Sequence, residues 1–189
     1  MTERPPFSRA ALLWGETEHW REVNQGLSEL IRLHGSRIGR VQRTALHIRA
    51  LYVDLFPLMD RLCAASCPSC PEPCCAKARV WIDFADLLFL HLSKSPIPRR
   101  QLITDTSQTC TFAGPAGCSL PRLARPWICL WYLCPIQRNL LRGRPAIDRL
   151  VQRHLRRIKA GRRAMEDGFI RLVSGRSQNR FGGQGPVQQ

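Results

Sequence analysis

The feature that most constrains this chain is a cluster of cysteines set among prolines. Eight of its nine cysteines lie between Cys67 and Cys134, and the first run reads Cys67-Pro-Ser-Cys70-Pro-Glu-Pro-Cys74-Cys75. Proline lacks a backbone N–H and has a fixed φ, so this run suits neither a regular helix nor a strand. We therefore expect residues 63–77 to form a loop that is held by side-chain ligation.

The four later cysteines fall in a second segment, residues 109–135, which is rich in glycine and proline. Between the two segments, residues 79–82 alternate polar and apolar side chains and predict a short strand. Asp83 then suits the N-cap of a helix that continues to Leu92, with Asp86 in its first turn. Two cysteine-bearing loops around one strand–helix unit predict that both loops supply ligands to a common metal-binding module.

The expected ligands are the eight clustered cysteines, with Cys63 outside the set. Zinc and iron–sulfur clusters both take four thiolates, so these cysteines fit one centre or two and leave the metal open. Neighbouring side chains such as Cys74 and Cys75 point to opposite faces of extended backbone, so they serve different centres, or one ligates while the other packs. The five histidines are scattered, and we expect them on the surface or in the core. The ligand set is Cys67, Cys70, Cys74, Cys75, Cys110, Cys118, Cys129 and Cys134.

Other roles for the thiols are alternatives. An odd number of cysteines fits poorly with a fully paired disulfide scaffold, and Cys67-x-x-Cys70 shares its loop with two further cysteines, unlike a thioredoxin-type dithiol. A redox dithiol and unmetallated structural cysteines stay open. No secretory signal and no apolar run of about 20 residues is visible, so we expect a cytoplasmic protein without a membrane span.

The flanks of the module predict helices, and the fold class is mainly α. Apolar periodicity indicates a helix over residues 16–34 and another over 37–62, where Pro57 should kink the chain or begin a new turn. A long helix is expected over residues 145–173. The chain then divides into a flexible N-terminus (1–15), a helical region (16–62), the cysteine-rich module (63–136), a basic helical region (137–173) and a disordered tail (174–189).

The order of these motifs resembles the YkgJ-like cysteine-cluster family, which is described as a zinc- or iron-chelating domain with eight characteristic cysteines. The resemblance rests on Cys67-x2-Cys70-x3-Cys74-Cys75, Asp83-x2-Asp86, Gly117-Cys118 and Arg125-Pro126-x2-Cys129, within residues 63–136. Pro71 stands where the family has glycine, one extra residue precedes the cysteine pair, and Leu130 stands where arginine is common. Because the family includes flagellin lysine methylases, the resemblance also implies a link to methyl transfer. This chain has no glycine-rich cofactor loop.

The net charge of +15 comes almost entirely from arginine and is concentrated after residue 137. On a helix these cations predict a solvent-facing basic surface, and nucleic acid or an acidic protein is its candidate partner. We expect Arg125 to anchor a loop carbonyl, and Trp127, Trp131 and Tyr132 to shield the metal. The sequence thus favours a metal-binding protein. The alternatives are a cluster-dependent methyltransferase or redox enzyme, and a zinc-stabilised interaction module. The cations are Arg138, Arg142, Arg144, Arg149, Arg153, Arg156, Arg157, Lys159, Arg162 and Arg163.

Overall fold

The structure is a computed structural model that describes residues 14–68, 70–71, 73–104, 108–114 and 117–175. It is mainly helical, which confirms the expected class. Residues 1–13 of the expected flexible N-terminus and 176–189 of the expected tail lie outside the described residues. In the described part, no helix has both the length and the apolar character to cross a membrane.

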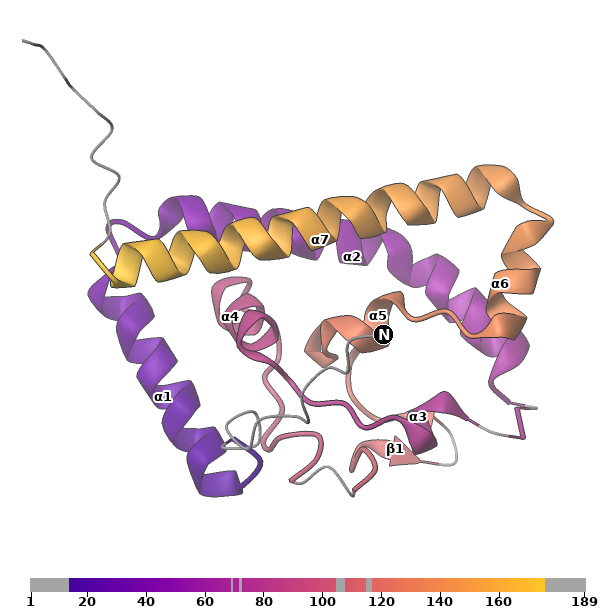
Figure 1. Cartoon of the computed structure of the whole chain (residues 1–189), viewed down its shortest axis with the longest axis horizontal. Coiled ribbons are helices and arrows are strands. Elements are labelled where there is room, and N and C mark those ends of the chain that lie inside the picture. The colour runs from indigo at the N-terminus through magenta and orange to yellow at the C-terminus, as the bar shows by residue number, and fades with distance from the viewer. Residues whose placement is uncertain (1–13, 69, 72, 105–107, 115–116, 176–189) are drawn as a thin grey trace, which may run out of the picture.

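Two long antiparallel helices form the main scaffold of the fold (Figure 1). Helix α2 (Gly39–Ser66) packs along helix α7 (Pro145–Val173), while α1 (Thr17–Leu33) lies at one end of the pair. A small residue permits the close approach of α2 and α7, because a Cβ atom at Gly161 would lie 3.0 Å from Ile48 Cγ1. The bounds of α1, α2 and α7 confirm the predicted helices over 16–34, 37–62 and 145–173, with small shifts at their ends.

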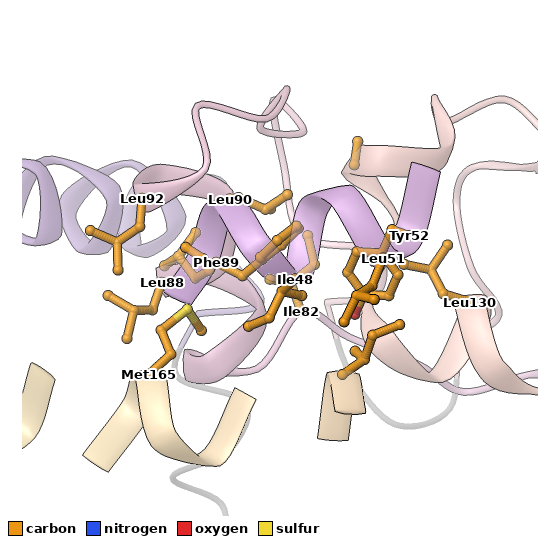
Figure 2. Close-up of a cluster of buried hydrophobic side chains, with 14 of the residues drawn as sticks. Ile48, Leu51, Tyr52, Ile82, Leu88, Phe89, Leu90, Leu92, Leu130 and Met165 are labelled. Carbon is orange, nitrogen blue, oxygen red and sulfur yellow. The ribbon is translucent and has the colours of Figure 1, made fainter. Parts of the chain in front are cut away.

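The hydrophobic core lies beneath this pair, where helix α4 (Phe84–Leu92) is inserted. Figure 2 shows Leu88, Phe89 and Leu90 of α4 among Ile48 of α2 and Met165 of α7. Helix α4 begins as predicted, because the Asp83 carboxylate accepts a hydrogen bond from the Asp86 amide at 2.7 Å. Its side chains are buried on nearly all sides, so α4 is the central element of the core.

The rest of the described chain is short elements joined by irregular backbone. Strands β1 (Ala113–Gly114) and β2 (Gly117–Cys118) form an antiparallel pair in which Ala113 opposes Cys118. The other elements are α3 (Cys74–Lys77), the 3₁₀ helix η2 (Arg122–Ala124), α5 (Trp127–Trp131) and α6 (Pro135–Arg142). Helix α3 lies beside β1 (Figure 1).

The predicted strand over residues 79–82 is wrong, because a buried glutamine takes the place of a partner strand. The Gln101 amide oxygen accepts hydrogen bonds from the backbone N–H groups of Ile82 (2.7 Å) and Leu102 (3.0 Å), and its nitrogen donates to the Ile82 carbonyl (3.0 Å). Buried backbone groups need partners, and here one side chain supplies three of them. The segment is extended and is not part of a sheet.

Three local expectations also change. Helix α2 continues through Pro57 to Ser66, because the burial of Leu58 and Met59 on the core face outweighs the lost backbone hydrogen bond. The cysteine segments, expected to be loops, contain the short helices α3 and α5. The apolar periodicity of residues 145–173 predicts that Leu150 faces inward, but this side chain is 43% exposed.

Candidate metal centre

The cysteines lie on seven different pieces of chain around α3, β1, α5 and the C-terminal end of α2, a region that we call the cysteine-bearing end (Figure 1). It comprises the described residues of 63–77 and 108–135. Two cysteines lie at the C-terminal end of α2, one follows in a loop, two lie in α3, two flank or enter the β1–β2 pair, and two belong to α5 and the start of α6. In chain order these are Cys63 and Cys67, Cys70, Cys74 and Cys75, Cys110 and Cys118, and Cys129 and Cys134.

None of the eight cysteines with a described side chain is buried. Cys67 and Cys74 are exposed, and Cys63, Cys70, Cys110, Cys118, Cys129 and Cys134 are half-buried. A cysteine that serves only as a small apolar core residue is among the most buried residue types in proteins. The exposure of these thiols therefore argues against a purely packing role for the set.

Gln137 joins the start of α6 to the C-terminal end of α2 through its buried amide. Its Nε2 donates to Cys63 Sγ at 3.7 Å and to Ser66 Oγ at 3.1 Å, and its Oε1 accepts from the Cys134 backbone N–H at 3.3 Å. Ser66 Oγ lies 3.8 Å from Cys67 Sγ. Cys63, which the sequence places outside the ligand set, thus shares a polar network with two expected ligands.

Two arginines form hydrogen bonds and an ion pair next to these thiols. Arg122 forms an ion pair with Asp60 of α2, and its Nη2 reaches Cys63 Sγ at 3.9 Å. Arg125 donates from Nε to the Leu120 carbonyl at 3.0 Å and from Nη2 to the Cys118 carbonyl at 3.4 Å. This confirms the predicted anchoring role of Arg125, which ties the β1–β2 pair to the start of α5.

A buried ion pair connects the cysteine-bearing end to the helical scaffold. Arg162 of α7 is 6% exposed and Asp86 of α4 is 5% exposed, and Arg162 Nη1 lies 2.7 Å from Asp86 Oδ1. The same Oδ1 accepts a hydrogen bond from the Trp127 backbone N–H at 2.9 Å. Trp127 opens α5, two residues before Cys129, so Asp86 holds the first turn of a cysteine-bearing helix.

An aromatic ring and a second carboxylate lie next to this ion pair. The Arg162 guanidinium lies 5.9 Å from the centre of the Trp127 ring and donates to Asp83 Oδ1 at 3.4 Å. Burial raises the pKa of Asp86, while the charge of Arg162 acts in the opposite direction and favours the carboxylate. Burial likewise raises the pKa of Tyr52, whose hydroxyl has no hydrogen-bond partner among the described residues.

The sequence interpretation missed this pair in both halves. Asp86 was expected only as a favourable charge in a first helical turn, and Arg162 only as one cation of an exposed basic surface. In the structure Arg162 lies in the apolar stripe of α7, four residues after Ile158 and three before Met165. The position of Arg162 within the apolar stripe could have indicated the ion pair from sequence, because a cation on a buried helix face needs a buried partner.

His91 and His47 contact other side chains of the helical scaffold. His91 Nε2 lies 2.9 Å from Asn24 Oδ1, and burial lowers its pKa. His47 Nε2 lies 3.1 Å from Arg157 Nη2. In the described part of the chain, no three Cys, His, Asp or Glu side chains lie close enough together to hold one metal ion.

Trp127 and Trp131 lie near the thiols in sequence but pack on one another, with ring centres 6.2 Å apart. Trp127 also packs against Tyr52 in the core, at 6.1 Å between ring centres. Tyr132 is 41% exposed. Trp127 thus connects the cysteine-bearing end to the core.

Comparisons of this chain with protein-family models, with curated proteins and with solved structures find no match.

Proposed function

We propose that the cysteine-bearing end binds a metal, either zinc or an iron–sulfur cluster, through thiolate ligands. The expected ligands are Cys67, Cys70, Cys74, Cys75, Cys110, Cys118, Cys129 and Cys134. The observation that carries the proposal is the accessibility of the thiols, because all eight cysteines with described side chains are at least partly exposed. Accessible thiols on several short elements can converge on a soft metal.

The local architecture supports the same conclusion. Among the described residues between Cys67 and Leu133, the elements other than the core helix α4 are two to five residues long. Such backbone gains little from helix or sheet hydrogen bonds, so its order depends on side chains such as Gln101, Arg125 and Gln137. A metal that joins several of these pieces would supply the missing cross-links, and its binding energy would become folding energy for this region.

Residues next to the ligands have a defined role in this proposal. Hydrogen bonds around metal-bound sulfur orient the ligands and tune the centre. Gln137 fixes the backbone at the expected ligand Cys134, because its Oε1 accepts the Cys134 N–H. Asp86 fixes the backbone two residues before Cys129. These residues would support the ligands without contacting the metal.

The test is anaerobic purification of the full chain, followed by assays of iron, acid-labile sulfide and zinc and by a visible spectrum. Brown protein with iron and sulfide, or colourless protein with stoichiometric zinc, supports the proposal and identifies the metal. Protein that contains no metal as isolated, and that takes up none on titration with zinc or on reconstitution with iron and sulfide, overturns it.

Single substitutions locate the ligands. Cys70→Ser and Cys129→Ser should each lower the bound metal, because a hydroxyl is a poor substitute for a thiolate. The matched control is Ser119→Ala, which changes an exposed neighbour of Cys118 and should keep the full metal content. Equal metal content in all three variants would exclude Cys70 and Cys129 as ligands.

A further inference from the structure

A line of arginines runs along the outer side of α7. Arg149, Arg153, Arg156 and Arg163 are all exposed, and their spacings of four, three and seven residues keep them on one face of a helix. This line lies opposite the buried stripe that includes Val151 and Ile158. At about 1.5 Å per residue, the line is about 21 Å long.

No acidic side chain of the described residues forms an ion pair with these four cations. The ion pairs of arginine with acidic side chains in the described part involve Arg32, Arg122 and Arg162, and none includes a member of the line. From the start of α7 to residue 165, the only acidic residue of the helix is Asp148, which is half-buried. The arginines therefore repel one another on a rigid helix, and a polyanion would relieve that repulsion.

The chemistry of the line favours phosphate over other anions. Arginine presents a fork of N–H donors that matches phosphate oxygens. Duplex DNA carries about one negative charge per 1.7 Å of axis, so a line of about 21 Å faces about 12 phosphates. A protein partner would be expected to insert aromatic or apolar anchors, and the line offers no aromatic surface to receive them.

The absence of aromatic side chains also selects among nucleic acids. Single strands are bound largely by stacking bases on exposed aromatic rings. The only aromatic residue of α7 is Phe169, which is buried in the core. We propose that the line Arg149, Arg153, Arg156 and Arg163 binds the phosphates of duplex nucleic acid without reading its sequence. This binding is independent of the metal, because α7 carries no cysteine.

The experiment is fluorescence anisotropy of the full chain with a labelled 20-base-pair duplex of random sequence, from 50 to 200 mM salt. The test variant replaces all four arginines of the line by glutamine, which keeps helix propensity. Loss of four phosphate contacts should flatten the slope of log affinity against log salt by about 3 to 4. The variant should bind the duplex at least about tenfold more weakly at 50 mM salt.

The control carries the same loss of charge elsewhere on the surface. It replaces four exposed arginines outside α7 by glutamine, at Arg21, Arg61, Arg79 and Arg99. The proposal predicts that this control keeps most of the affinity and most of the salt slope. Circular dichroism of both variants verifies that the helices are intact.

Four results would overturn the proposal. The first is absence of duplex binding at 50 mM salt, and the second is equal weakening in the test and control variants. The third is stronger binding to poly-glutamate than to the duplex, which would identify an acidic protein as the partner. Tighter binding to a single strand of the same length would likewise contradict the choice of a duplex.

Discussion

The helical scaffold and the cysteine-bearing end are held together in different ways. In the scaffold, α2, α4 and α7 bury continuous apolar stripes, and residues such as Ile48, Leu88 and Ile158 are fully enclosed. The cysteine-bearing end has few buried apolar residues and relies on side-chain amides and guanidinium groups that bind the backbone. Hydrophobic burial alone can thus stabilise the scaffold. The cysteine-bearing end has less of this stabilisation, and a bound metal would supply more.

The largest expected effect comes from breaking the junction between the two regions. Arg162→Ala leaves the Asp86 carboxylate buried without its cation, and the loss of one partner of a buried pair costs about 3–5 kcal/mol of unfolding free energy. Urea denaturation measures the change. The matched control is Arg163→Ala, which removes the exposed neighbour and should change the unfolding free energy by less than about 0.5 kcal/mol. Equal effects at the two positions would contradict a buried role for Arg162.

A smaller effect is expected from Gln101, which supports the irregular backbone next to the core. Gln101→Leu removes three hydrogen bonds to backbone groups of residues 82 and 102, so we expect a loss of about 2–3 kcal/mol. The control is Gln152→Leu on the exposed face of α7, and urea denaturation again compares the two. A Gln101 variant as stable as the control would mean that this side chain does not replace a partner strand.

The smallest effect is expected at Gly117, beside Cys118. Gly117 has φ +97°, which side chains other than hydrogen rarely allow, and no atom lies within 4 Å of a Cβ built there. Gly117→Ala should therefore cost about 1 kcal/mol through backbone strain alone. Gly143→Ala, at a residue with φ −74° and equally open surroundings, is the control and should be neutral. A neutral Gly117 variant would show that the β1–β2 pair adapts easily.

The sequence predicted the scaffold well because its signals are local. Periodic apolar residues, the Asp83 cap and Pro145 at the first turn of α7 each act within a few residues of themselves. The features it missed depend on residues that are distant in the chain. Gln101 replaces a strand partner 19 residues away, and Arg162 pairs with Asp86 across the core.

The cysteine-bearing end was predictable in composition but not in arrangement. The spacing of proline and cysteine indicated two irregular segments. In the structure, the described residues between α2 and α3 are indeed irregular backbone. Two features of this region depend on tertiary packing and not on a local pattern. Helix α2 extends past Cys63, and Gln137 connects this end of α2 to the start of α6 at Cys134. The ligand set itself stays a prediction.

The most direct test of the difference between the two regions is amide hydrogen exchange with and without metal. Protein loaded with its metal should be compared with the same protein after chelation. The account predicts faster exchange after metal removal in residues 63–77 and 108–135, with little change in α4 and in the first half of α2. Unchanged exchange in the cysteine-bearing end, or equal acceleration across the whole chain, would contradict it.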